Sequence, residues 1–397
     1  MAAEPVYIAG VDAGSHYTRC VICRLQDGCL QLAGYGEVAS RGWQKGRLID
    51  QNAVSECILA TVHQGEHMAG VPLESIVLGM GGATVSGVNN WGVHAVGHPR
   101  HFSQADLAHA VDEAARVMLP EDRMLLHLFP QDFSVDGRPG HRNPRGMIGS
   151  RLDAYVHLVT ASTQEHRSLL GAAHQAHLAV QETVFEPLAA AYAALLPEDR
   201  REGIAVLDIG AHSTDLVVYY GDALIHAASL PICGDHFTWD IAKGFHVSYE
   251  DAESIKRQHG SAVVETTADN SFIEIPSPAD RDRREMPRRT LNMILEARAR
   301  ELFNWVQREL VRIAVDQDML CAILSGGAAR LNGMCDTAEQ VLNCQARNGL
   351  PIGIQDWPQD LNNPSWTTAA GLAMYAARLK LRAESDRRGN GFFNRRR

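Results

Sequence analysis

The chain has 397 residues, too many for one compact core, so we expect two or more domains. Apolar residues make up 45% of the sequence and charged residues 21%, which is typical of a globular protein. The formal net charge of -10 argues against nucleic-acid binding by overall electrostatic attraction, so we expect no nucleic-acid partner.

The start of the chain has none of the features of a targeting segment. Met1 to Val11 contains no basic region and no long apolar core, so we predict no signal peptide. Elsewhere, no apolar run reaches the roughly 18 residues that a membrane-spanning helix needs. We therefore expect the protein to be made and kept in the cytoplasm.

Two segments far apart in the chain resemble each other. Asp, Gly, His and Thr recur in the same order 196 residues later, so that Asp12, Gly14, His16 and Thr18 match Asp208, Gly210, His212 and Thr214. Each segment predicts a strand, a tight polar turn and a second strand, because apolar and β-branched residues flank Gly and Ser. A hairpin repeated at this distance indicates two copies of one domain.

The repeated turns have the composition of a polyphosphate site. Each turn can present backbone N–H groups and hydroxyls to an anion. Each Asp can face a hydrated cation, because magnesium prefers oxygen ligands and retains water. Two such turns facing each other would hold a polyphosphate between them. A single turn of this kind is more often an ordinary hairpin turn, and the repetition favours the binding site.

Cys20 and Cys23 have the spacing of a metal or redox pair, but no second pair with zinc spacing follows. Both belong to an apolar run that predicts a strand, where residues three apart point to opposite faces. We therefore expect packed, reduced thiols.

Three later segments place polar residues or glycines at predicted helix starts. Glu186 can orient water near a phosphate, or can interact with the N-terminus of the helix that it precedes. Glu253 and Lys256 share one helix face, so they can bond a ribose together or form a solvated ion pair. Gly326 and Gly327 follow an apolar strand, and paired glycines let backbone approach a flat ligand such as a purine.

Together these motifs resemble the actin, chaperone and sugar-kinase ATPase superfamily. The resemblance is carried by the paired turns, Glu-Pro-Leu-Ala-Ala-Ala at 186–191 and Ser-Gly-Gly-Ala at 325–328. Within the superfamily, three segments are similar to the FtsA family of cell-division proteins: Ser-Arg-Gly-Trp-Gln-Lys-Gly at 40–46, Pro-Gln-Asp-Phe at 130–133 with Asn-Pro at 143–144, and Ala-Glu-Ser-Ile-Lys at 252–256. The resemblance runs from about residue 6 to residue 377.

The resemblance implies an α/β, actin-like fold with two RNase H-type lobes around an ATP cleft and an FtsA-type inserted subdomain in the first lobe. The first lobe (1A) is expected at 1–82 and 152–198, rejoined by 372–382, with the inserted subdomain (1C) at 83–151. The second lobe (2A) is expected at 199–233 and 290–371, with subdomain 2B at 234–289. Residues 383–397 are expected to form a basic linker and membrane-targeting tail.

The resemblance also implies ATP and Mg²⁺ as cofactors. The implied ATP-binding residues are Asp12, Gly14, Ser15, Thr18, Asp208, Gly210, Ser213, Thr214, Glu253, Lys256, Gly326 and Gly327. Asp12 and Asp208 would contact Mg²⁺ through water, and Glu186 is the candidate catalytic residue of what is at most a weak ATPase. The second turn of the family usually has consecutive glycines where this chain has Ala211-His212, and a positive φ would be least favourable at Ala211.

The implied function is that of an actin-like protein that polymerises at the membrane, tethers the FtsZ ring to the inner membrane at the division site and recruits later division proteins. The inserted subdomain would contact a neighbouring subunit and those later proteins. The FtsZ C-terminal peptide would bind near subdomain 2B, where Arg288, Arg289 and Arg298 can pair with its carboxylates. A solvated arginine-rich loop is the alternative.

The C-terminal tail is basic, with eight basic and two acidic residues from Arg378 onward. Basic residues attract anionic lipid by about 1 kcal/mol each near the surface, and aromatic side chains can insert at the interface. The predicted membrane-binding residues are Phe392, Phe393, Arg395, Arg396 and Arg397. Two glycines and one apolar pair predict a poor helix, so we expect a weak anchor that needs several copies in a filament. A disordered basic tail is the alternative.

Two other functions remain open at this point. A protein similar to PilM of type IV pilus assembly would bind a short pilus peptide instead of FtsZ. A sugar-kinase-like phosphotransferase would need a deep acceptor pocket with a general-base Asp, and the sequence offers no clear candidate for that residue.

Overall fold

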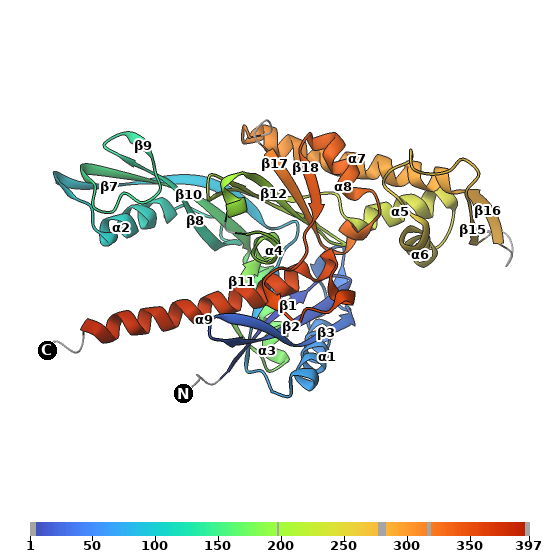
Figure 1. Ribbon diagram of the computed structural model, residues 1–397, viewed down its shortest axis with the longest axis horizontal. Helices are drawn as coiled ribbons and strands as arrows, with labels where there is room; N and C mark the ends of the chain where they lie inside the picture. The colour runs from blue at the N-terminus through green and yellow to red at the C-terminus, as the bar shows by residue number, and fades with distance from the viewer. Residues whose placement is uncertain (1–4, 197, 277–282, 316–318, 394–397) are drawn as a thin grey trace.

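The computed structural model describes residues 5–196, 198–276, 283–315 and 319–393. Two lobes lie one above the other, and two smaller units extend to opposite sides of the upper lobe (Figure 1). Each lobe contains one large mixed sheet with helices packed against it.

The first lobe is built on a six-stranded sheet in the order β11-β6-β1-β2-β3-β19. Its strands are β1 (Val6–Ala13), β2 (Tyr17–Gln26), β3 (Cys29–Ala39), β6 (Ser75–Met80), β11 (Ala179–Phe185) and β19 (Ile354–Gln355). The first three strands are an antiparallel meander, whereas β6 runs parallel to β1 and β11 runs parallel to β6. The helices packed against this lobe are α1 (Gln51–Ala69), α3 (Thr163–Gln175), α4 (Glu186–Ala194) and the start of α9 (Thr367–Phe393).

Local sequence explains how closely α1 packs on this sheet. Asp50 caps the helix by accepting hydrogen bonds from the backbone of Asn52 and Ala53 at 3.0 and 3.1 Å. A β-carbon on Gly36 of β3 would lie 2.1 Å from the carbonyl oxygen of Thr61, so glycine is required at this contact. Between β3 and α1 lies a short hairpin of β4 (Trp43–Gln44) and β5 (Arg47–Leu48).

The second lobe repeats the plan of the first. Its sheet has the order β14-β13-β12-β17-β18, made of β12 (Gly203–Ile209), β13 (Thr214–Tyr220), β14 (Ala223–Leu230), β17 (Met319–Ser325) and β18 (Gln345–Asn348). Again three strands form an antiparallel meander and two follow in parallel. The duplication predicted from the matching hairpins is therefore confirmed, and β12 is the counterpart of β1.

A four-stranded sheet with one helix forms the inserted unit. The sheet order is β7-β10-β8-β9, from β7 (Ser86–His101), β8 (Arg123–Val135), β9 (Arg138–His141) and β10 (Ile148–Ser162), and α2 (Gln104–Ala115) packs on it. The strand β10 continues to Ser162, beyond the expected limit at 151. The amide of Gln131 donates to the carbonyls of Leu224 and Ile225, so the unit also contacts β14, the edge strand of the second lobe.

The smaller unit on the other side contains α5 (Gly234–Phe245), α6 (Tyr249–His259) and a hairpin of β15 (Phe272–Pro276) and β16 (Arg283–Pro287). The long helix α7 (Arg288–Arg312) starts there and continues along the second lobe with α8 (Met334–Leu342). Short 3₁₀ turns lie at Glu198–Arg201, Gly327–Arg330, Gln359–Leu361 and Pro364–Trp366. Leu302, Val306 and Leu310 of α7 are fully buried, as their helical spacing predicts.

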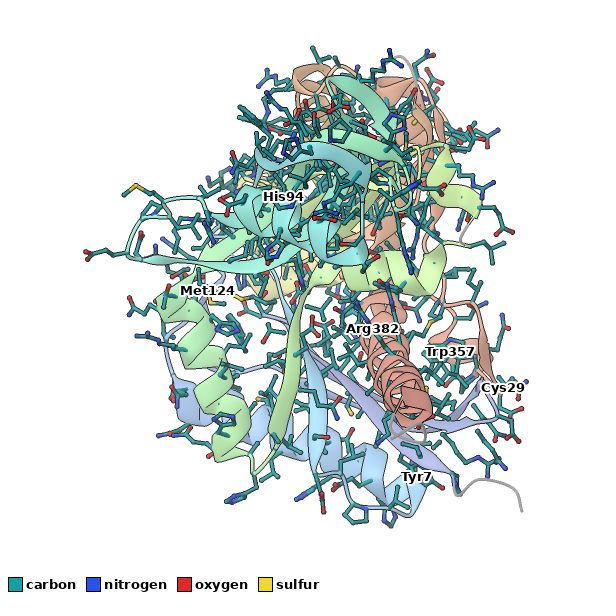
Figure 2. All side chains as sticks on the ribbon, turned by 90° about the vertical axis from the view of Figure 1, so that its left-hand side faces the viewer. Tyr7, Cys29, His94, Met124, Trp357 and Arg382 are labelled. Atoms are coloured by element: carbon teal, nitrogen blue, oxygen red, sulfur yellow. The ribbon has the colours of Figure 1, made fainter. Side chains whose placement is uncertain are left out.

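The helix α9 extends well beyond the body and runs through Gly389 and Gly391 to Phe393, where the sequence predicts a poor helix. Its first half is packed in the first-lobe core through Leu372, Ala373 and Ala376. Elongation from a packed helix avoids the unfavourable nucleation step, which explains why two glycines do not end it. Seen nearly end-on, α9 leaves the body below the inserted unit, with Arg382 on its projecting part (Figure 2). No helix among the described residues is long and apolar enough to cross a bilayer.

Candidate functional site

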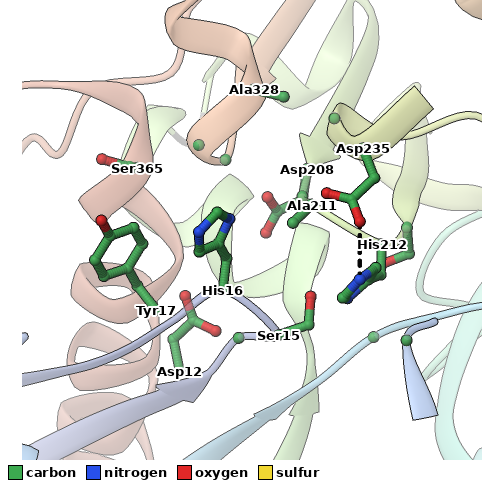
Figure 3. Close-up of a pocket in the computed structure, with 18 of the residues that line it drawn as sticks. Asp12, Ser15, His16, Tyr17, Asp208, Ala211, His212, Asp235, Ala328 and Ser365 are labelled. Carbon is green, nitrogen blue, oxygen red and sulfur yellow. Dashed lines mark ion pairs between the residues drawn. The ribbon is translucent and has the colours of Figure 1, made fainter. Parts of the chain in front are cut away.

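The two repeated hairpins converge on one cavity between the lobes. Asp12 precedes the turn between β1 and β2, and Asp208 precedes the turn between β12 and β13. The turns border a cavity of about 280 Å³, into which labelled side chains from both lobes project (Figure 3). All the predicted ATP-binding residues line this cavity except Thr18 and Thr214, and Glu186 lines it too.

Thr18, the second residue of β2, and Thr214, the first residue of β13, are fully buried and do not line the cavity. The Thr18 hydroxyl is 2.8 Å from that of Ser40, which in turn donates to the carbonyl of Gly14 at 2.6 Å. The Thr214 hydroxyl has no hydrogen-bond partner within the described part of the chain. In this structure the two threonines therefore belong to the support of the turns.

The backbone of the second turn accommodates Ala211-His212 without strain. Neither residue has a positive φ, so the penalty considered for Ala211 does not arise. The start of α5 is fastened to this turn, because Gly234 N–H donates to Gly210 O and Asp235 N–H donates to Ala211 O, both at 2.9 Å. His212 Nε2 lies 2.9 Å from Asp235 Oδ2 (Figure 3).

Carboxylates gather at the base of the cavity. Burial, with Asp208 close by, raises the pKa of Asp12 to about 7. Burial also raises the pKa of Asp208, and burial with Asp12 nearby raises that of Glu186 well above its ordinary value. A cluster of buried carboxylates of this kind favours binding of a cation, because the cation offsets their mutual repulsion. Within the described ranges, no three His, Cys, Asp or Glu side chains are placed to share one ion directly, so a cation here would be held through water.

The opposite wall comes from α6 and the turn after β17. Glu253 and Lys256 form an ion pair of 2.6 Å, and both bond the Thr238 hydroxyl, at 2.6 and 2.7 Å. The pair lines the cavity with side chains only 19% and 12% exposed, so it is not the solvated surface pair considered as an alternative. Gly326 has φ +86°, and a β-carbon there would lie 2.4 Å from Asp208 Oδ1, whereas Gly327 faces open space.

Several residues at the site were not predicted from the sequence. Asp215 accepts hydrogen bonds from Gly82 N–H at 2.9 Å and from the Ser213 hydroxyl at 3.2 Å. Thr368, in the first turn of α9, donates to Asp208 Oδ2. One available signal was overlooked: Asp215 lies 196 residues after Arg19, so the repeat extends to the strand positions directly opposite Asp208 and Asp12.

Cys20 and Cys23 lie buried in β2, away from the cavity lining. Burial raises the pKa of the Cys23 thiol to about 12, and that of Cys20 still further. Such thiols stay protonated and unreactive.

Comparison with known proteins identifies the family. Residues 205–371 match the family model described as cell division protein FtsA, and residues 82–160 match that of the SHS2 domain inserted in FTSA. The cell division protein FtsA of Pseudomonas aeruginosa is 31% identical over 382 residues, covering 96% of this chain and 90% of that protein. The Escherichia coli K12 protein of the same name is also 31% identical, over 394 residues, covering 97% and 94%.

The chain belongs to the FtsA family. The resemblance drawn from the sequence is therefore confirmed, and the SHS2 match coincides with the inserted unit. In this FtsA-family chain the insertion lies between β6 and α3.

Solved structures confirm that this FtsA-family chain has the actin-like fold. A chain of the PilM-PilN type IV pilus biogenesis complex superimposes with a TM-score of 0.68 at 19% identity, covering 94% of this chain and 99% of that one. MreB5 of Spiroplasma citri bound to ADP gives a TM-score of 0.57 at 12% identity, covering 95% and 98%. At these identities the likeness concerns the fold alone.

The arginines expected to bind a partner of this FtsA-family protein are all engaged within the chain. Arg288 donates to the carbonyl of His259 at 2.8 Å, and Arg289 lies 3.2 Å from Asp269. Arg298 binds both carboxylate oxygens of Asp240, at 2.6 and 3.0 Å, and also bonds Glu301. Its side chain is 21% exposed, against 45% for Arg289, so Arg289 is the more accessible of the two.

Two of the five expected membrane-binding residues lie at the far end of α9. Phe392 and Phe393 are the last two residues of the helix, but only their backbone is described. Arg395, Arg396 and Arg397 lie outside the described residues.

Proposed function

We propose that this protein binds Mg-ATP between its lobes and acts at the inner face of the membrane as an actin-like scaffold of cell division. In this role it assembles into filaments, tethers the FtsZ ring and recruits later division proteins. The observation that carries the proposal is the convergence of two repeated hairpins on one cavity, in a chain of the FtsA family. The solved MreB5 structures with ADP and AMPPNP support a nucleotide in an actin-like cleft.

Each part of the cavity suits one part of the nucleotide. Backbone N–H groups of Gly14, Ser15 and Ser213 hold the phosphates, whereas the N–H of Gly210 closes the second turn by donating to the carbonyl of Ser213 at 2.9 Å. Asp12 and Asp208 hold Mg²⁺ through water, and the ion would supply positive charge against the phosphates. The polar pair Glu253 and Lys256 bonds the ribose, and the open space beside Gly327 receives the purine. In this assignment, Thr18 and Thr214 support the turns and do not contact ATP.

Glu186 would act in ATP hydrolysis, which would be weak at most. It is the first residue of α4, and its carboxylate approaches Gly81, where a β-carbon would lie 2.3 Å from Oε2. Burial and the neighbouring carboxylates raise its pKa, which favours the protonated form when no cation is present. A bound cation reverses that preference and leaves a carboxylate that can orient a water molecule.

The proposed peptide-binding and membrane-binding sites lie at two ends of the molecule, away from the cleft. Arg289 on α7 is accessible enough to pair with an acidic peptide such as the FtsZ C-terminus, since its own partner Asp269 is exposed to solvent, while Arg288 and Arg298 would have to leave more buried partners first. The basic C-terminus beyond the packed part of α9 meets anionic lipid, with Phe392 and Phe393 at the interface.

Calorimetry on the full chain tests nucleotide binding. We expect Mg-ATP to bind with one site per chain, and binding to weaken when Mg²⁺ is chelated. Absence of any heat with Mg-ATP, supported by an unchanged melting temperature, would refute the central claim.

Sedimentation tests the scaffold. We expect the full chain to sediment with vesicles containing anionic lipid, more strongly with Mg-ATP, and a chain ending at residue 388 to remain in solution.

A peptide-binding assay tests the partner site. Charge reversal Arg289→Glu should weaken binding of an FtsZ tail peptide, whereas Arg308→Glu, which alters a residue stacked on Trp305 of the same helix, should not. Equal vesicle binding by both chain lengths would refute the tail as anchor, and equal peptide binding by both variants would refute the Arg289 site.

A further inference from the structure

The second phosphate turn carries an imidazole side chain, that of His212. His212 lines the cavity, with its Nε2 held 2.9 Å from Asp235 Oδ2 and its side chain 23% exposed. The other ring nitrogen, Nδ1, is buried and has no hydrogen-bond partner among the residues that the structure describes. A buried polar atom without a partner is unfavourable, so a small shift of the ring that brings Nδ1 to a ligand atom in the cavity would relieve this penalty.

Asp235 is fixed in place and ionised. Its Oδ1 accepts a hydrogen bond from the Tyr249 hydroxyl at 2.7 Å, and its backbone N–H donates to Ala211 of the same turn. Burial raises the pKa of Asp235, but the hydrogen bonds from His212 and Tyr249 outweigh burial and lower it overall. An ionised, immobile carboxylate sets the orientation of the ring, because Nε2 must present its proton to Asp235.

The position of His212 points to the phosphates. It follows Asp208 by four residues in the turn that borders the polyphosphate site, and Ser213 follows it directly. From the other lobe, the loop between β4 and β5 comes close, since a β-carbon on Gly46 would lie 3.3 Å from the β-carbon of His212. The ring therefore stands where the lobes approach each other, on the same turn whose backbone holds the phosphates.

We propose that His212 donates from Nδ1 to the terminal phosphate of a nucleoside triphosphate and makes the cleft prefer a triphosphate to a diphosphate, with Asp235 as the positioning residue that orients its ring. This inference rests on the proposed nucleotide binding. When the ring carries both protons, Nε2–H donates to Asp235 and Nδ1–H donates to the phosphate, so each negative group meets a donor. A side chain thus adds a charged contact to a turn that otherwise offers backbone N–H groups.

Calorimetry with Mg-ATP and Mg-ADP on the full chain tests this assignment. We expect the wild type to bind Mg-ATP more tightly than Mg-ADP. His212→Gln, His212→Gly and Asp235→Asn should each weaken Mg-ATP about tenfold and leave Mg-ADP within about twofold, in keeping with loss of one charge-assisted hydrogen bond. His212→Arg, which restores a cationic donor, should recover part of the preference.

The neighbouring histidine provides a matched control. His236 lies on α5 one residue after Asp235 but bonds Cys233 and does not line the cavity, so His236→Gln should leave both affinities unchanged. A wild type without a preference for ATP, or His212 variants that lose both nucleotides equally, would overturn the role of His212. A wild type that binds neither nucleotide would instead refute the proposed nucleotide binding itself. Melting temperatures of all variants separate these outcomes from loss of folding.

Discussion

The two phosphate turns have the same backbone plan and opposite electrostatic surroundings. In the first hairpin the residue directly across from Asp12 is Arg19, which also pairs with Glu37 at 2.7 Å. In the second hairpin the residue directly across from Asp208 is Asp215, another carboxylate. The two hairpins therefore share the same turn but differ in the residue that lies across from its aspartate. The second hairpin thus places two carboxylates opposite each other, where the first places a carboxylate opposite a cation.

The supports of the two turns differ as well. Ser40, at the end of β3, holds the first turn by bonding Gly14 and lying next to Thr18, so this support comes from the same meander. The second turn is held by α5 and crowded by Gly326, so its support comes from elements outside the meander. A displacement of the smaller unit would consequently reach the second turn first.

The largest effect is expected from adding a methyl group beside the second turn. Gly326→Ala forces a β-carbon to within 2.4 Å of Asp208 Oδ1 at a φ of +86°, so it should lower the free energy of unfolding by about 1–3 kcal/mol and weaken Mg-ATP binding at least tenfold. Gly327→Ala, which meets no atom within 4 Å, is the matched control and should keep the wild-type stability. Thermal unfolding and calorimetry measure both quantities, and equal melting temperatures for the two variants would contradict the crowding.

The next effect concerns the cation. Asp208→Asn should weaken Mg-ATP binding about tenfold, equivalent to about 1.4 kcal/mol, and should do so more than Asp12→Asn. The reason is that the residue directly across from Asp12 is a cation, Arg19, which counteracts part of the effect of burial on Asp12, whereas the residue across from Asp208 is the carboxylate Asp215. Calorimetric titrations of ATP at several Mg²⁺ concentrations give the comparison. A larger loss for Asp12→Asn would show that the charge difference between the hairpins does not govern cation binding.

A third effect is pH-dependent. Burial, with Asp208 nearby, raises the pKa of Asp215 from 3.8 to about 6. The folded state therefore holds this proton more tightly than the unfolded chain, and stability is lost as pH rises from about 4 through 6. Without Mg²⁺ or nucleotide, we therefore compare the free energy of unfolding of Asp215→Asn with that of the wild type. Between pH 5 and pH 8 the difference should shift in favour of the variant by on the order of 1 kcal/mol.

The control for this pH effect is an exposed carboxylate. Asp112→Asn, on the outer side of α2, removes a negative charge at a residue that is open to solvent, and should leave the pH profile of unfolding unchanged. A profile for Asp215→Asn that is parallel to the wild type between pH 5 and pH 8 would argue against an unfavourable buried charge at this position.

The smallest effect compares the matching threonines. Thr18→Val removes a hydroxyl that lies 2.8 Å from Ser40 and should destabilise the protein by about 1 kcal/mol. Thr214→Val removes a buried hydroxyl for which the described residues provide no partner, so it should be neutral or stabilise by up to about 1 kcal/mol. Denaturant unfolding of both variants measures the difference. Equal destabilisation would mean that the two turns are supported alike.

Local and repeated patterns made much of this molecule predictable. The match of Asp12 with Asp208 led to the duplicated lobes, and glycines at 14, 210 and 326 led to the cavity. Because two turns with the same backbone conformation need similar residues, the duplication is still visible in the sequence of the turns. The roles of Thr18 and Thr214 were harder to assign, because a residue after a turn can face either the ligand or the core, and the strand register decides which.

Contacts between distant segments were not predictable in the same way. Asp215 bonds Gly82, which lies 133 residues earlier, and Thr368 bonds Asp208 from 160 residues away. Neither pair leaves a periodic signal, since each depends on how two lobes and a terminal helix pack together. The continuation of α9 through two glycines was missed for a related reason: propensity describes an isolated segment, whereas this helix grows from a packed one.

The helix α9 joins the cleft to the C-terminal end as a single stiff rod. Thr368 in its first turn holds Asp208, and 27 residues of helix span about 40 Å from that point. A tilt of a few degrees at its root therefore swings the far tip by several ångströms. A force applied to the tip would in turn be transmitted through Thr368 to Asp208 in the opposite lobe.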